Sequence, residues 1–262
     1  MDDLKREIML LCESLTGDVS LHIRIGDEEI GYQSNVPLIA ASLIKVPCAY
    51  ALLMLSQEGD VDLDELIVVT DREKIGGTGV LVHMPGDVHL TYRQLVSLMI
   101  TVSDNTATNV IIDQVGIPYI QEVVDRSGCE GTKIQRKIMH TNPNEQPLKN
   151  VMSAKDMNRF LMLIDQGTEL EEGNKAFLLS CLTGQQLIHK LPYLFSDGLP
   201  PTAFVAHKTG DDIKMEHNGG IIKINNKTAY VTVMTDQLER NIDGQALIQQ
   251  VGKQVYDYLN AP

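Results

Sequence analysis

A serine and a lysine stand three residues apart at the start of an apolar stretch, at Ser42 and Lys45. Residues at this spacing lie on the same side of a helix, so the lysine amine can reach the serine hydroxyl. A serine hydroxyl is a weak nucleophile until a neighbouring base takes its proton. The pair predicts an activated nucleophile, although S-x-x-K by itself is more often a helix start with a solvated lysine.

Two further motifs, in order along the chain, strengthen this prediction. Ser103-Asp104-Asn105 alone is typical of a helix cap, and Lys208-Thr209-Gly210 alone is typical of a strand end. Together with S-x-x-K they form the signature of class A β-lactamases and penicillin-binding proteins. The chain resembles this family of serine hydrolases, and the resemblance extends over nearly its whole length.

The residues at the motifs predict the first steps of acyl transfer. Ser42 is the expected nucleophile and Lys45 the nearest base. A lysine takes a proton at neutral pH only if burial or a neighbouring cation favours its neutral form, and Lys208 could be that cation. The resemblance implies that Ser103 relays a proton toward the leaving nitrogen.

The resemblance also implies how a substrate is held. Asn105 would hydrogen-bond the substrate amide, and Lys208 and Thr209 would hold a substrate carboxylate or its equivalent. Gly210 would let the substrate lie along the edge of its strand. These roles imply a small-molecule substrate and need neither a cofactor nor a metal.

Backbone N–H groups of Ser42 and Asp211 would form the oxyanion hole. A helix start suits the first of them, because free N–H groups and the helix dipole favour negative charge there. Asp211 contributes only its backbone in this interpretation. Its carboxylate would repel a substrate carboxylate, so a less anionic substrate is conceivable.

One segment departs from the class A pattern, in which an R-x-E-P-x-L-N loop carries the Glu that activates the deacylating water. The corresponding stretch here is Arg136-Lys137-Ile138-Met139, with Ile138 at the position of the Glu. An isoleucine cannot take a proton. Glu145 is the only carboxylate in the loop and is a candidate base if the loop folds back. The alternatives are deacylation through Lys45, or slow deacylation of β-lactams.

The pattern of apolar residues predicts an α+β protein, which agrees with the β-lactamase/transpeptidase-like fold that the resemblance implies. Strand-like runs with terminal helices occupy residues 1–40 and 190–262, and helical runs occupy 41–189. This predicts an antiparallel sheet lobe built from both chain ends and an all-helical lobe between them, in one structural domain overall. The resemblance implies that the sheet has five strands and that the active site lies between the lobes.

Composition limits the remaining possibilities. The chain has 262 residues and a formal net charge of −13, and the absence of a broad basic cluster argues against nucleic acid as a partner. The cysteines and histidines lack metal-ligand spacing. The first residues do not resemble a signal peptide, and no apolar run has the length of a membrane span. A cytoplasmic protein away from the membrane is therefore expected, or an exported one if a signal has been removed from the sequence. The oligomeric state is left open.

The sequence therefore predicts a serine acyl-hydrolase, with a weak β-lactamase as the first interpretation. The substrate could instead be a D-Ala-D-Ala-type peptide or another small amide or ester. A cytoplasmic location favours a small-molecule hydrolase over a cell-wall peptidase. A protein that is acylated without turnover, as in a β-lactam sensor, is the second hypothesis, because the usual deacylating Glu is missing.

Overall fold

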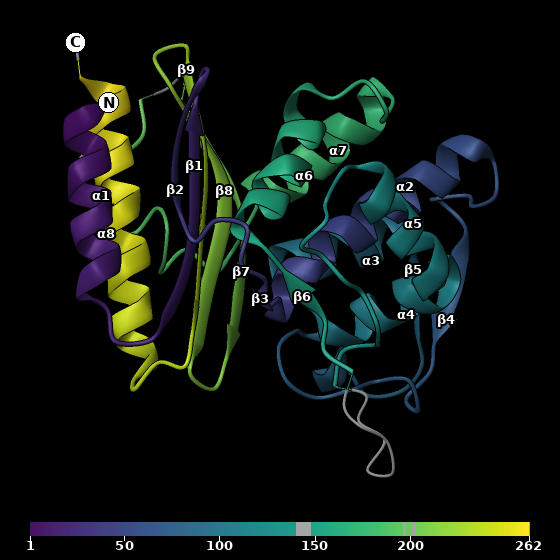
Figure 1. Cartoon of the computed structure of the whole chain (residues 1–262). Helices are drawn as coiled ribbons and strands as arrows, with labels where there is room; N and C mark the ends of the chain where they lie inside the picture. Colours follow the sequence, from purple (N-terminus) through teal and green to yellow (C-terminus); the bar gives the residue numbers. More distant parts are fainter. Residues whose placement is uncertain (140–147, 196–197, 201–202, 262) are drawn as a thin grey trace.

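A five-stranded antiparallel sheet forms one part of the molecule, as predicted, with strand order β2-β1-β9-β8-β7 (Figure 1). The computed structural model describes residues 1–139, 148–195, 198–200 and 203–261. The strands are β1 (Asp18–Ile25), β2 (Glu28–Tyr32), β7 (Phe204–Asp212), β8 (Met215–Ile224) and β9 (Lys227–Asp236). Both ends of the chain thus contribute strands to the same sheet.

The last three strands are longer than the apolar pattern indicates. The sequence predicts a strand ending at Lys208, whereas β7 continues to Asp212 and pairs with β8 along its whole length. Its final residues are charged and break the alternation, but backbone pairing does not depend on side-chain polarity. The predicted turn between β8 and β9 is confirmed, with Asn225 and Asn226 both at positive φ, as a tight hairpin turn requires.

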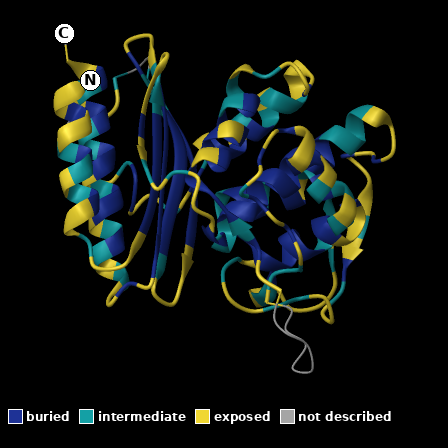
Figure 2. Ribbon diagram, in the orientation of Figure 1, coloured by how far each residue is buried: buried dark blue, intermediate teal, exposed yellow. Residues whose placement is uncertain are grey.

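Two terminal helices, α1 (Asp2–Ser14) and α8 (Asn241–Asn260), pack side by side on one face of the sheet (Figure 1). Their apolar sides form a closed core with the sheet, and their outer sides are exposed (Figure 2). Ile8 and Ile248 are completely buried in this layer. The opposite face of the sheet is covered by the helical part of the molecule.

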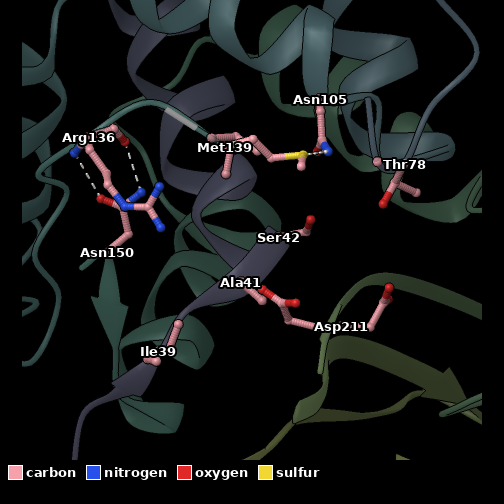
Figure 3. A pocket seen from close by; sticks show the side chains of 12 residues that line it. Ile39, Ala41, Ser42, Thr78, Asn105, Arg136, Met139, Asn150 and Asp211 are labelled. Atoms are coloured by element: carbon pink, nitrogen blue, oxygen red, sulfur yellow. Dashed lines mark hydrogen bonds between the residues drawn. The ribbon is translucent and has the colours of Figure 1, made fainter. Parts of the chain in front are cut away.

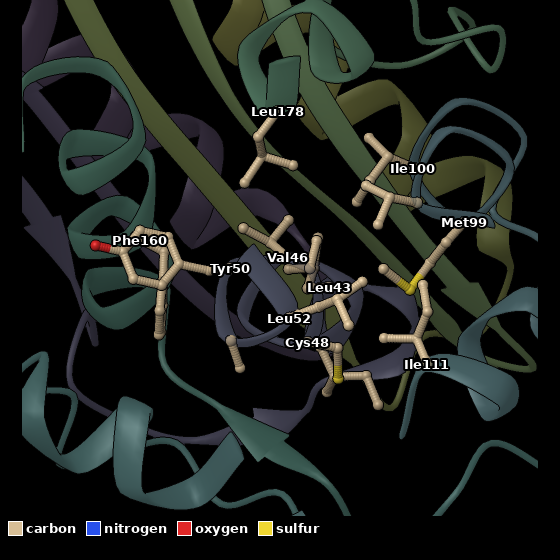
Figure 4. Close-up of a cluster of buried hydrophobic side chains, with 14 of the residues drawn as sticks. Leu43, Val46, Cys48, Tyr50, Leu52, Met99, Ile100, Ile111, Phe160 and Leu178 are labelled. Carbon is tan, nitrogen blue, oxygen red and sulfur yellow. The ribbon is translucent and has the colours of Figure 1, made fainter. Parts of the chain in front are cut away.

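The helical part is built around α2, which is buried on nearly all sides. Its helices are α2 (Lys45–Glu58), α3 (Tyr92–Thr101), α4 (Asn105–Val115), α5 (Ile117–Arg126), α6 (Ala154–Gln166) and α7 (Glu172–Thr183). Side chains of α2 and the turn before it pack against α3, α4, α6 and α7 in one apolar cluster (Figure 4). The predicted N-cap Thr91 is confirmed, in a reciprocal capping box with Gln94.

The part between the sheet strands is not purely helical, contrary to the all-helical lobe that the sequence predicted. Short strands form two pairs, β3 (Leu38–Ile39) with β6 (Val151–Met152) and β4 (Leu66–Val69) with β5 (Val88–Thr91). Two 3-10 turns, η1 (Ala41–Ile44) and η2 (Leu81–His83), also occur. These elements have only a few residues each, too few for a periodic apolar pattern to identify them.

A buried amide joins the helical part to the sheet. Asn158 of α6 donates to the carbonyl oxygens of His22 (2.9 Å) and Tyr230 (3.0 Å) and accepts from the Thr232 hydroxyl (2.6 Å). Each of these groups is buried, and hydrogen bonding offsets the cost of removing them from water. The two parts are thus held in a defined relative position at the inner face of the sheet.

The four cysteines are buried free thiols, as expected for small apolar residues. Within the described ranges, no helix has the length and apolar character needed to cross a membrane. In the same ranges, no group of three or more His, Cys, Asp or Glu side chains could hold a metal ion.

Candidate active site

Ser42 and Lys45 lie within hydrogen-bond distance, with 2.9 Å between the lysine Nζ and the serine Oγ. Ser42 belongs to the 3-10 turn η1, and Lys45 is the first residue of α2, so the motif spans the junction between two helical forms. The sequence predicted a continuous helix from Ser42. The tighter turn still places both side chains on the same side, since i and i+3 are eclipsed in a 3-10 helix.

The Lys45 amine has four oxygen neighbours. Besides Ser42, it contacts the Ser103 carbonyl oxygen (2.7 Å), the Ser103 hydroxyl (2.9 Å) and the Asn105 side-chain oxygen (2.8 Å). The carbonyl and amide oxygens only accept hydrogen bonds, so they take two N–H groups. A neutral amine then has its lone pair left to accept the proton of a serine hydroxyl. The arrangement therefore accommodates Lys45 as a base.

Burial sets the charge of this lysine. Lys45 is 0% exposed, and burial lowers its pKa to about 7, against the attraction of Asp104 and Asp211. Burial and repulsion by Lys45 also bring the pKa of Lys208 well below its usual range. Desolvation alone favours the neutral amine of Lys45, so a cationic Lys208 is not needed to lower its pKa.

Ser103 connects the two lysines. Its hydroxyl lies 2.9 Å from the Lys45 Nζ and 3.0 Å from the Lys208 Nζ. A hydroxyl can accept from one amine and donate to the other, so it can pass a proton between them. Ser103 has φ of +56° and Ala41, next to the nucleophile, has φ of +43°. Such conformations cost non-glycine residues about 1–3 kcal/mol and concentrate at functional sites.

Asp104 anchors the loop in front of the site. Its carboxylate caps α4 through the Ala107 N–H (2.9 Å) and also accepts from the N–H groups of Val80 (2.7 Å) and Leu81 (2.9 Å). Gly79 lies directly against it with φ of +123°, and a side chain there would meet the Asp104 backbone. This fixed loop brings Gly77 and Thr78 to the site, beside Asn105.

A cavity of about 560 Å³ opens beside Ser42 (Figure 3). Residues from the helical part and from strand β7 line it: Ile39, Ala41, Ser42, Gly77, Thr78, Asn105, Arg136, Ile138, Met139, Asn150, Asp211 and Asp212. Of the predicted site residues, Ser42, Asn105 and Asp211 therefore face the cavity. Lys45, Ser103, Lys208 and Thr209 are buried next to it, and the Thr209 hydroxyl has no hydrogen-bond partner among the described residues.

Gly210 is the strand position at which β7 passes close to η1. A side chain there would contact Leu43 and the ring of His217 at 3.3–3.4 Å. Asp211 follows directly, with its side chain 43% exposed. Because β7 is the edge strand of the sheet, its free side faces the helical part at this point.

The loop that departs from the class A pattern reaches the cavity with apolar side chains. Ile138 lines the cavity, and Asn109 holds it by accepting from its N–H (2.8 Å) and donating to its carbonyl oxygen (3.1 Å). The Met139 sulfur contacts the Asn105 amide nitrogen at 3.7 Å (Figure 3). The candidate base Glu145 lies outside the described residues.

Two further residues organise the site, although no sequence motif marks them. Asn150 accepts from the N–H groups of Gln135 (2.7 Å) and Arg136 (3.1 Å), and its own carbonyl oxygen accepts from Ala40 (2.9 Å). Lys190 is completely buried behind β7, where it pairs with Glu216. Neither belongs to a motif, and only the tertiary structure brings them to the site.

The model of the beta-lactamase enzyme family matches residues 3–259. The chain belongs to the β-lactamase enzyme family. It is therefore a β-lactamase-family serine hydrolase, which agrees with a serine and a lysine in hydrogen-bond contact at the cavity.

Relatives of this β-lactamase-family chain are distant in sequence. A β-lactamase from Bacteroides uniformis is 23% identical over 248 residues, which are 87% of this chain and 81% of that protein. The β-lactamase structure from Sphaerobacter thermophilus has 25% identity and a TM-score of 0.91 over 99% of this chain and 98% of that one. The structure of PBP-A has 26% identity and a TM-score of 0.86 over 98% and 96%. A leucine-to-glutamate variant of PBP-A has been solved as an acyl-enzyme with penicillin G.

Proposed function

We propose that this protein is a serine acyl-hydrolase that forms an acyl-enzyme at Ser42 with β-lactams or related small amides and esters. The observation that carries the proposal is the Lys45 amine. Two pure acceptors take its N–H groups, burial favours its neutral form, and the Ser42 hydroxyl lies 2.9 Å away. A base in that state can take the serine proton at neutral pH.

In the proposed acylation, the Ser42 hydroxyl proton passes to Lys45 as Oγ bonds to the substrate carbonyl carbon. The N–H groups of Ser42 and Asp211 hold the resulting oxyanion. The proton then passes from Lys45 through the Ser103 hydroxyl to the leaving nitrogen or oxygen, and the bond to the leaving group breaks. The contacts of 2.9 Å from Lys45 to each serine hydroxyl support this route.

Deacylation distinguishes hydrolysis from stable acylation. Asn105, Ile138 and Met139 line the cavity where a class A enzyme would need a carboxylate beside the acyl-enzyme. Among the described residues that line the cavity, only Asp211 and Asp212 carry carboxylates, and they lie on β7. We therefore propose slow turnover of β-lactams. Lys45 and Glu145 are the remaining candidate bases.

A non-turnover β-lactam sensor is the second candidate function, favoured by the same apolar wall. The PBP-A variant with penicillin G is a precedent for acylation alone, in a protein 26% identical to this one, since that variant carries a glutamate in place of a leucine. A D-Ala-D-Ala-type peptidase or a small-molecule esterase would use the same acylation steps. Multiple turnovers of any ester would separate these hydrolases from the sensor.

Intact-protein mass spectrometry tests the proposal directly. Incubation with penicillin G, and separately with a neutral fluorophosphonate, should add one adduct mass, and peptide mapping should place it on Ser42. The Ser42→Ala variant is the control and should gain no mass. An adduct on another residue, or equal labelling of the variant, would refute the assignment of the nucleophile.

A further inference from the structure

The wall of the cavity formed by β7 presents negative charge. Asp211 and Asp212 both line the cavity that contains Ser42. Lys190, which pairs with Asp211, and Lys208 are both 0% exposed, and Arg136 lines the cavity as well. A substrate that enters the cavity along β7 therefore meets the carboxylates of Asp211 and Asp212, while the ammonium groups of Lys190 and Lys208 lie beneath them.

Lys190 is already paired inside the protein. Its Nζ lies 2.5 Å from the Glu216 carboxylate and 3.3 Å from the Asp211 carboxylate, and it donates to the Gly210 carbonyl oxygen at 3.0 Å. Glu216 is buried and also accepts from Asn241 (3.0 Å) and Gln245 (2.9 Å). A buried charge with this many partners stays in place, so Lys190 is committed to the protein and not to a substrate.

The same contacts fix Asp211 at the cavity in its charged form. Burial raises the pKa of this carboxyl, but attraction by Lys190 and Lys208 outweighs it, and the net pKa lies below the usual range. The side chain remains 43% exposed. Figure 3 shows Asp211 beside Ala41 and next to Ser42, with Asn105 on the other side of Ser42. A fixed, partly exposed anion thus faces the nucleophile.

We propose that Asp211 selects substrates whose leaving group carries a cationic ammonium, and disfavours those with a carboxylate there. This inference rests on the proposed function. The family resemblance puts a substrate carboxylate on this same strand, at Lys208 and Thr209, but Asp211 would repel it and lower the rate of acylation. Repulsion of the wrong charge is a common source of specificity.

Three thioacetates of nearly equal shape test the proposal. Their leaving thiols carry a trimethylammonium group, its neutral tert-butyl isostere, or a sulfonate, and thiol release in the first turnover measures acylation even without deacylation. The native protein should react with the cationic ester about tenfold faster than with the neutral one at low salt, and slowest with the anionic ester. The preference should weaken as ionic strength rises, because salt screens exposed charges.

Asp211→Asn should bring the rates of the three esters within about twofold of one another. Glu216 remains to pair with Lys190 in this variant, and a melting curve checks its folding. Asp27→Asn is the control, because it removes an equal charge from the exposed turn between β1 and β2 and should keep the native preference. A control that loses the preference would assign it to the overall charge and overturn the role of Asp211.

The rates of the native protein with the three esters test the inference even if the Asp211→Asn variant does not fold. Equal rates for the three esters, or a faster anionic ester, would overturn the inference while labelling of Ser42 by the neutral fluorophosphonate leaves the proposed function standing. Failure of the esters to acylate Ser42 and of the fluorophosphonate to phosphonylate it would refute the proposed function, and the inference with it.

Discussion

At the scale of single residues, the charge of Lys45 controls the proposed chemistry. Burial lowers its pKa to about 7, so the amine is protonated below that pH and neutral above it. The rate of Ser42 acylation should therefore rise about tenfold per pH unit below 7 and level off above it. The rate of fluorophosphonate labelling between pH 5 and 9 measures this profile.

Substitution separates the two lysines at the site. Lys45→Ala should slow acylation by about 10²–10⁴-fold, the usual contribution of a general base, and should abolish the rise near pH 7. Lys208→Ala should lose less, because its Nζ contacts Ser103 and not Ser42. Equal losses for the two variants, or a flat profile in the native protein, would contradict the assigned roles.

The side chain at position 138 tests how the acyl-enzyme is cleared. Ile138 lines the cavity, and the native protein should therefore accumulate a long-lived penicilloyl adduct. Ile138→Glu should shorten the life of this adduct by supplying a base for water, while lowering the melting temperature, since the residue also packs against the core. Mass spectrometry over time measures the adduct.

Ile138→Gln is the matched control for this substitution. It introduces a polar side chain of similar size that cannot take a proton at neutral pH, so it should destabilise the protein without clearing the adduct. Rapid clearance of penicillin by the native protein, with no detectable adduct, would show that Ile138 does not limit deacylation. Glu145 would then be the leading base.

At the scale of elements, the loop before η2 has to fit against the start of α4. A Cβ at Gly79 would lie 2.6 Å from the Asp104 Cα, and its φ of +123° also disfavours a side chain. Gly79→Ala should destabilise the protein by about 1–3 kcal/mol and slow acylation, because the loop positions Thr78 and Asn105. Gly76→Ala, with open space around it, should change stability little. Urea denaturation of both variants measures the difference.

The helices and strands also show which parts of the fold could be predicted from the sequence alone. Long helices such as α6 were predicted from their periodic apolar residues, and the capped start of α3 from Thr91. The short strands β4 and β5 were missed, because four residues with mixed polarity have no recognisable period. The motifs predicted which residues gather at the site.

The state of those residues could not be predicted, since it depends on burial by distant parts of the chain. Nothing next to Lys45 in the sequence indicates a pKa near 7, because the desolvation comes from the folded protein as a whole. Lys190 likewise reaches Asp211 and Glu216 only after β7 and β8 have paired.

At the scale of the whole molecule, the outer helix α8 supports the active site through the segment that carries Lys190. Gln249 donates to the His189 carbonyl oxygen at 2.7 Å, and Gly252 lies so close that a Cβ there would overlap the Leu191 carbonyl oxygen. Leu191 itself is buried in the core between α8 and the sheet. The absence of a side chain at Gly252 thus fixes the distance between α8 and the support of β7.

Gly252→Ala should therefore affect the active site, although residue 252 lies in α8, outside that site. The added methyl has to push the segment at Leu191 away from α8, which should destabilise the protein by about 1–3 kcal/mol. Since Lys190 moves with that segment, its hold on Asp211 should weaken, and the preference for a cationic leaving group should fall as well. Gly173→Ala is the control: this exposed position in α7 has open space around it, so alanine should stabilise the protein by about 0.5–1 kcal/mol and leave the preference unchanged. Loss of stability without any change in ester preference would mean that α8 supports the fold but not the position of Asp211.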